Sequence, residues 1–88
     1  MGFALSKQFK RDLSKLAPEI LASYEWAEVM YHLHRRRTLP ERYLDHALGG
    51  EWRGYRDCHV KNDLVLIYRH SGEDLLLARL NSHSEVFG

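Results

Sequence analysis

Cysteine is almost absent from this chain of 88 residues, in which Cys58 is the only one. A single cysteine excludes a disulfide within the chain and suits a reducing compartment such as the cytoplasm. No apolar run approaches the roughly 18 residues that a membrane span needs. The first residues, MGFALSKQFKRD, also lack the cationic start and the apolar stretch of a secretory signal. We therefore expect a cytoplasmic protein that does not enter a membrane.

Recognisable metal-binding spacing is missing as well. The chain has six histidines, but it contains neither HExxH nor CxxC nor a comparable ligand pattern. His32 and His34 are two positions apart on a predicted helix, so their side chains do not face each other. We expect no metal and no other cofactor.

An excess of charge is also missing, because 13 Lys and Arg side chains nearly balance 12 Asp and Glu. The net charge of +1 divides into +3 for residues 1–44 and −2 for residues 45–88. Binding of RNA would therefore depend on a local patch rather than on the field of the whole protein. One cationic cluster, Arg35 to Arg37, ends a predicted helix. It has a structural role there, at the negative end of the helix dipole, and RNA contact is the alternative role.

What the sequence does contain is the pattern of a small α+β domain. Its length suffices for one domain with one modest core, at residues 1–88. A short strand and two helices precede an antiparallel sheet, and the helices pack on one face of that sheet. The expected elements are a strand at 3–5, helices from Ser6 to about Leu16 and from Pro18 to about Arg37, and strands at 52–60, 63–69 and 74–80.

The strand-forming sequence also predicts which residues face the core. The run 64–68 is apolar at every position, which is typical of a central strand covered on both faces. The reversals before and after it are predicted at Lys61-Asn62 and at residues 70–73.

Alternation along the strands gives further expectations. Leu77 and Arg79 should share one face, with the residues between and after them on the other. Cys58 and His59 are adjacent and should point to opposite faces. This argues against a Cys–His nucleophilic pair and makes Cys58 a packing residue.

Side chains that can transfer a proton or hold a phosphate stand at the borders of these strands. Histidine suits proton transfer because its unperturbed pKa is about 6.5, and arginine has a planar fork that grips phosphate oxygens. One small sheet can bring these groups to a single surface, and RNA cleavage without metal needs a base, an acid and a cation. Each histidine alone has a structural explanation, so it is their joint placement that indicates catalysis. The candidates are His46, His59, Asp63, Arg79 and His83.

Four motifs in the second half of the chain together resemble the YafQ branch of the RelE-type toxins of bacterial toxin–antitoxin modules. They are DHALGG at 45–50, W-x-GYRD-x-HV at 52–60, D-x-x-LIY at 63–68 and S-H-S-x-V-F-G at 82–88. The order of elements fits this family over nearly the whole chain. One position departs from the family member that we compare, because Leu64 stands where that relative has an aromatic residue. Codon preference or efficiency is expected to differ if that aromatic ring stacks on RNA.

The resemblance implies a RelE-like fold and a toxin that is a ribosome-dependent endoribonuclease. Such a toxin cuts mRNA in the A site of the 70S ribosome and is kept silent by a cognate antitoxin. The ribose 2′-OH attacks the adjacent phosphorus without a metal, leaving a 2′,3′-cyclic phosphate and a 5′-OH. Matched position by position, the catalytic residues fall on His46, His59, Asp63 and His83, with Phe87 as a supporting contact and Arg79 as the transition-state arginine.

Two other classes of protein share this fold. One is the ParE type, a non-catalytic inhibitor of gyrase, against which His46, His59 and His83 argue because a pure binder does not need them. The other is an RNA- or protein-binding module that has lost activity, against which the intact set of polar positions argues. The sequence leaves open which residue is the acid and which is the base.

Overall fold

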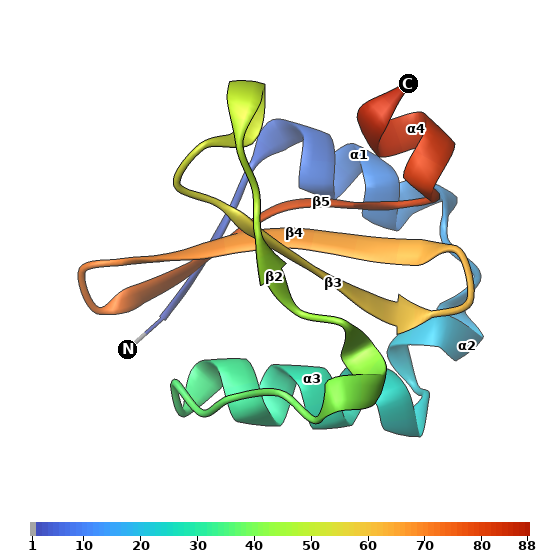
Figure 1. Ribbon diagram of the computed structural model, residues 1–88. Coiled ribbons are helices and arrows are strands. Elements are labelled where there is room, and N and C mark those ends of the chain that lie inside the picture. The colour runs from blue at the N-terminus through green and yellow to red at the C-terminus, as the bar shows by residue number, and fades with distance from the viewer. Residues whose placement is uncertain (1) are drawn as a thin grey trace.

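Five strands form one mixed sheet in the computed structural model, which describes residues 2–88 (Figure 1). The strands lie in the order β1-β5-β4-β3-β2; β1 runs parallel to β5, and the other neighbours are antiparallel. The predicted α+β class is confirmed. The elements are β1 (Phe3–Leu5), α1 (Lys7–Lys15), α2 (Pro18–Leu21), α3 (Tyr24–His34), η1 (Glu41–Tyr43), β2 (His46–Ala47), η2 (Gly50–Trp52), β3 (Arg56–Lys61), β4 (Leu64–Ser71), β5 (Asp74–Asn81) and α4 (His83–Phe87).

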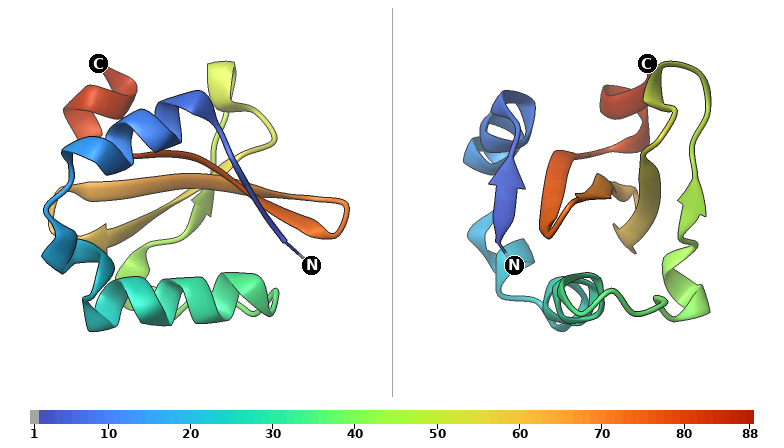
Figure 2. Two further views of the ribbon diagram at one scale, coloured as in Figure 1. Left: turned by 180° about the vertical axis from the view of Figure 1, so that it is seen from behind. Right: turned by 90° about the vertical axis from the view of Figure 1, so that its left-hand side faces the viewer.

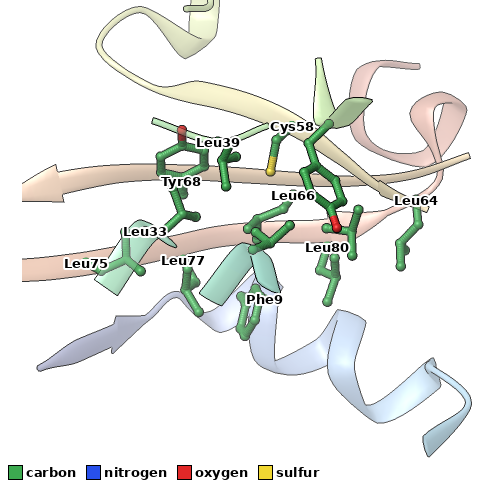
Figure 3. Packing of buried hydrophobic residues seen from close by; sticks show 13 residues of the cluster. Phe9, Leu33, Leu39, Cys58, Leu64, Leu66, Tyr68, Leu75, Leu77 and Leu80 are labelled. Carbon is green, nitrogen blue, oxygen red and sulfur yellow. The ribbon is translucent and has the colours of Figure 1, made fainter. Parts of the chain in front are cut away.

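The central strand β4 is covered on both faces, as its apolar sequence predicts. A larger core lies between the sheet, α1 and α3, and takes Leu66 and Tyr68 from β4 (Figure 3). A smaller core lies on the opposite face, beneath α4, and takes Val65 and Ile67. Figure 2 shows α3 and α4 on opposite sides of the sheet. The helices predicted before the sheet do pack on one face, because α1, α2 and α3 all contribute to the larger core. Only α4, which the sequence did not predict, covers the opposite face. Cys58 is fully buried in the larger core, which confirms its packing role.

Serine residues decide where the helices begin. The Ser6 hydroxyl accepts a 3.0 Å hydrogen bond from the Phe9 N–H and starts α1, as predicted. The second predicted helix is wrong in its extent, because the chain breaks into α2 and α3. At the break, the Ser23 hydroxyl accepts a 3.2 Å bond from the Trp26 N–H. A serine side chain competes for backbone hydrogen bonds and here caps a new helix instead of continuing the old one.

The arginine cluster lies just beyond α3, which ends at His34 instead of near Arg37. Arg35 is the C-cap, and Arg36 adopts a left-handed conformation with φ 56°. The Arg36 guanidinium donates to the Gly72 carbonyl in the β4–β5 turn. These arginines therefore lie at the negative end of the helix, and one of them joins it to the sheet. No helix within residues 2–88 is long and apolar enough to cross a membrane.

Three features of the second half differ from the expectation. Trp52, expected to begin a strand, lies in η2, and β3 begins only at Arg56. The two-residue strand β2 was not predicted, because its pairing with β3 is what defines it. The helix α4 was not predicted either. Its N-cap is Ser82, whose hydroxyl accepts from the Glu85 N–H at 3.2 Å.

A β-bulge reverses the predicted alternation at the end of β5. Ile67 pairs with Arg79 but the next residue, Tyr68, pairs with Leu77, so Ala78 is an extra residue in β5. Leu77 therefore faces the larger core, and Arg79 projects from the opposite face with Ile67. The expectation that Leu77 and Arg79 share a face is wrong for this reason.

The buried carboxylate of Asp12 attaches α1 to the end of β5. It accepts hydrogen bonds from Arg79 Nε at 2.8 Å, from the Leu80 N–H at 2.9 Å and from Asn81 Nδ2 at 3.1 Å. Asp12 is 5% exposed. Burial alone would raise the pKa of Asp12, but the hydrogen bonds and the charge of Arg79 outweigh this, so that the pKa is lowered.

We predict that Asp12→Ala lowers the free energy of unfolding by about 2 to 3 kcal/mol, because Arg79 and a backbone N–H would lose their partner. A lowered pKa stabilises the folded state above the unfolded pKa of about 3.9, and this contribution is lost as the pH falls through the folded pKa. Urea unfolding at pH 7 and pH 3 measures both effects. Lys10→Ala, on the exposed side of α1, is the control and should change little. Equal losses at the two pH values would contradict the ionic part of this account.

Candidate active site

One row of residues across the sheet collects polar side chains of the predicted site. His46 of β2 pairs with Asp57 of β3, Asp57 pairs with Ile67 of β4, and Ile67 pairs with Arg79 of β5. Residues paired across antiparallel strands project from the same face. His59 lies two positions beyond Asp57 on β3 and so projects from this face too. The face is the one beneath α4 (Figure 1).

Asp57 is the residue of this row that the sequence analysis missed. Its side chain is 2% exposed. Burial raises the pKa of Asp57, and the charges of His46, His59 and His83 act in the opposite direction. The carboxylate therefore lies within electrostatic reach of all three histidines. The sequence could have indicated Asp57, because it lies two residues before His59 in a predicted strand, and residues i and i+2 of a strand share a face.

The hydrogen bonds of His46 determine its tautomer. Its Nδ1 lies 2.8 Å from the Leu44 carbonyl oxygen and 3.1 Å from Asp57 Oδ1. Both neighbours are acceptors, so Nδ1 carries the hydrogen, and Nε2 of the neutral ring holds the lone pair. The carbonyl is the better-aligned acceptor; within residues 2–88, Asp57 Oδ1 has no hydrogen bond of good geometry. The His46 side chain is 55% exposed, so Nε2 is available to a substrate proton.

Asp63 contacts His83 through the backbone. The β3–β4 reversal is Asn62-Asp63, one residue later than predicted, and Asp63 has φ 54°. Aspartate tolerates this left-handed conformation better than most residues. Its Oδ1 accepts the His83 N–H at 3.1 Å, at the first turn of α4. The carboxylate thus fixes where the helix that carries His83 begins.

Phe87 and Leu64 have different surroundings. The Phe87 ring lies one helical turn after His83, with the two ring centroids 4.8 Å apart, and it also packs on the smaller core. It therefore restrains the His83 imidazole, while its role as a substrate contact stays a prediction. Leu64 is buried at 7% exposure in the larger core.

Arg79 is held in one orientation by Asp12. The carboxylate oxygens of Asp12 lie 2.8 Å from Nε and 3.1 Å from Nη2. These hydrogen bonds raise the pKa of Arg79 and keep it charged. With Nε and Nη2 engaged, Nη1 is the nitrogen left to meet a further anion.

The site as a whole combines proton-transferring groups with a fixed cation. His46 contacts the buried Asp57, His59 and Arg79 lie on the same face of the sheet, and the charges of His59 and His83 also act on Asp57. Within residues 2–88, no three His, Cys, Asp or Glu side chains are grouped as metal ligands. The arrangement is suited to moving a proton between two positions and to stabilising negative charge between them.

Comparison with known proteins gives a consistent result over the whole chain. Residues 1–88 match the family model described as bacterial toxin of type II toxin–antitoxin system, YafQ. A putative toxin YafQ from Haemophilus influenzae is 49% identical, over 92% of this chain and 86% of the relative. An mRNA interferase toxin YafQ from Escherichia coli strain B is 36% identical, over 94% of this chain and 91% of the relative.

Solved structures share the fold. A copper-bound mutant toxin from Helicobacter pylori has a TM-score of 0.85 at 36% identity, over 99% of each chain. The Escherichia coli DinJ-YafQ complex includes a chain with a TM-score of 0.77 at 31% identity, over 98% of this chain and 97% of that one.

We predict that Asp57→Asn does not destabilise the protein and raises its free energy of unfolding by about 1 kcal/mol at pH 8, because it removes a buried charge. The raised pKa means that the unfolded chain loses its proton first, so wild-type stability falls as the pH rises from the unfolded value of about 3.9 through the folded pKa. The gain should therefore vanish near pH 3.

Thermal unfolding at the two pH values measures this difference. Asp63→Asn is the control, because Asp63 is exposed and an asparagine oxygen can still accept the His83 N–H. A loss of stability for Asp57→Asn at pH 8 would mean that attraction to the histidines outweighs the burial of the carboxylate.

Proposed function

The chain belongs to the YafQ family of bacterial type II toxins, and we propose that it is an endoribonuclease that cuts mRNA on the ribosome. The observation that carries this proposal is the row of His46, Asp57 and Arg79 on one face of the sheet, shared by His59, in a chain of this family. The relative from Escherichia coli is named an mRNA interferase, which supports the reaction class.

The proposed reaction uses the ribose 2′-OH as the nucleophile. A base removes its proton while its oxygen attacks the adjacent phosphorus, and an acid protonates the departing 5′ oxygen. The products are a 2′,3′-cyclic phosphate and a 5′-OH. His46 is suited to accept a proton at Nε2, because its Nδ1 is committed to the Leu44 carbonyl. His83 is assigned the leading acid–base role, and His59 completes the proton path.

The carboxylates act on these histidines and not on the substrate. Asp57 stabilises an imidazolium that forms during the reaction, and it does so strongly because it is buried. Asp63 positions His83 through the backbone N–H. Arg79, held by Asp12, meets the charge that develops on the phosphoryl oxygens.

The partners follow from the family and from the openness of the site. The substrate is mRNA in the A site of the 70S ribosome, which supplies the RNA geometry that an open site does not. A cognate antitoxin keeps the toxin inactive in the cytoplasm; the DinJ-YafQ complex of Escherichia coli is the precedent for such a partner.

The test of this function is to map 5′ ends on a defined mRNA with the protein, with and without translating ribosomes. We expect new 5′-hydroxyl ends within codons only when ribosomes are present. Gyrase inhibition without new RNA ends would indicate the ParE type instead. Binding without either effect would indicate an inactive module.

We predict that His83→Gln slows single-turnover cleavage by roughly 100-fold or more, because a positioned proton-transfer group contributes about 10²–10⁴-fold to the rate. The fold and ribosome binding should persist, since His83 is exposed. His34→Gln, at the exposed end of α3, is the matched control. A His83 variant that cuts within a few-fold of the wild type removes this residue from the mechanism. A loss of ribosome binding would assign it a positional role.

We predict that cleavage needs no metal beyond the magnesium of the ribosome, and that added copper inhibits it. The Helicobacter pylori toxin is described with copper bound, and a metal on an imidazole nitrogen occupies the lone pair that accepts a proton. Rates are compared after removal of transition metals with a selective chelator and after addition of Cu²⁺. Activity that disappears with the chelator and returns with one specific metal contradicts this mechanism.

A further inference from the structure

A cavity of about 360 Å³ lies on the α3 side of the sheet, between α3, η1 and the end of β3, and it borders the candidate active site at His59. Figure 1 shows where these three elements come together. It exists because β2 is short. β2 pairs with β3 only at Asp57 and Arg56, so the edge of β3 from His59 to Lys61 borders the cavity and not another strand. Its volume falls in the range of small-molecule sites.

The cavity is lined by one candidate histidine and by residues that are bonded to, or next in sequence to, the groups that hold the other two. His59 lines it directly. Leu44 lines it too, and the Leu44 carbonyl accepts the hydrogen bond of His46 Nδ1. Asn62 lines it as well and is followed by Asp63, which binds the His83 N–H. The unpaired edge of β3 links this cavity to the face that carries the histidines. An RNA that passes around this edge, with its cleaved phosphate among the histidines, would place a neighbouring nucleotide at the cavity.

Two residues that line the cavity leave large apolar side chains exposed to solvent, which is energetically unfavourable. Tyr24 is 69% exposed and Leu44 is 59% exposed. Leu44 also has φ 51°, a left-handed conformation that is unfavourable for a bulky residue. Neither exposure is explained by packing in the core. A ligand that stacks on Tyr24 and covers Leu44 would explain both.

The charges around the cavity argue against a phosphate as its occupant. Lys61 Nζ lies 3.0 Å from Glu25, and Arg42 is paired with Glu28. Each cation is thus balanced by a carboxylate. Among the uncharged polar residues that line the cavity, Asn62 has a side-chain amide, which offers a donor and an acceptor together. An aromatic surface, an apolar wall and an amide are the features by which proteins bind an unstacked nucleobase.

We propose that this cavity receives one unpaired base of the mRNA next to the cleaved bond, and that Asn62 reads its edge. The cavity then sets the sequence preference of the cut. This inference rests on the proposed function, since it takes the nucleotide at the cavity to be part of the substrate.

The test compares three variants on ribosomes programmed with an mRNA pool that contains every codon. Asn62→Ala should reduce the preference for one base at one mRNA position. The cutting rate for the preferred base should fall by about 10-fold, toward the rates for the other three bases. Tyr24→Ala should lower cleavage of all sequences by about 10-fold, because stacking is largely independent of sequence. Tyr31→Ala, an exposed tyrosine of α3 that does not line the cavity, is the matched control and should change neither quantity.

Three outcomes overturn the inference while the proposed function stands. The first is an unchanged rate and pattern for both cavity variants. The second is a lower cleavage rate that is explained by weaker ribosome binding, with an unchanged sequence preference. This result would assign the cavity to ribosomal RNA. The third is a loss that follows a lower melting temperature, which would make these residues structural.

A direct binding measurement separates this inference from the proposed function. A short RNA with a 2′-deoxyribose at the cleaved position cannot react, and it should shift the NMR signals of the Asn62 side-chain amide and the Tyr24 ring. If the wild type does not cut mRNA, the proposed function fails. In that case the shifts still support the base site, and their absence overturns it.

Discussion

The bulge in β5 determines on which side of the sheet the reactive face is built. The extra residue, Ala78, moves Arg79 to the face of Ile67 and returns Leu80 to the larger core. A bulge leaves backbone groups without sheet partners, and α1 supplies them here. The Ser6 hydroxyl donates to the Ala78 carbonyl at 2.7 Å, and Asp12 accepts the Leu80 N–H. The start of α1 and the bulge are therefore joined directly by hydrogen bonds, and Asp12 of the same helix holds Arg79.

Asp57 is a buried carboxylate that lowers stability, in contrast to Asp12. A carboxylate that is 2% exposed loses much of its hydration, and its Oδ1 has no well-aligned hydrogen bond within residues 2–88. Asp12, equally buried, is fully engaged by donors, and its pKa is lowered where that of Asp57 is raised. The contrast separates their roles. Asp12 stabilises the fold, whereas under the proposed function Asp57 is a charge that acts on the nearby histidines.

Local sequence predicted the parts of the fold that local interactions decide. The apolar run of β4 and the cap at Ser6 are confirmed, because each depends on its own residues. The break at Ser23 was not predictable, since a serine within an apolar helical pattern fits both continuation and a new cap. β2 and α4 are too short to form alone and depend on tertiary contacts, such as the Asp63 bond to the start of α4. His59 lies on the same face as Asp57, as alternation along β3 requires, whereas His46 reaches this face through the unpredicted strand β2. Alternation failed at Arg79, where the bulge adds a residue.

Three of the catalytic candidates are fixed by groups that have no part of their own in the proposed reaction. The Leu44 carbonyl fixes His46, Asp63 fixes the start of α4 at His83, and Asp12 fixes Arg79. The substrate itself is not enclosed, because His46 is 55% exposed and His83 lies on the surface. Such a site can supply proton transfer and charge stabilisation but not the in-line geometry of the 2′-OH, which in enzymes is worth several orders of magnitude in rate. Under the proposed function, that geometry comes from an mRNA already bent in the ribosome. Under the same proposal, RNA away from ribosomes is expected to stay uncut, because an open site with rigid catalytic groups does not hold its substrate in that geometry.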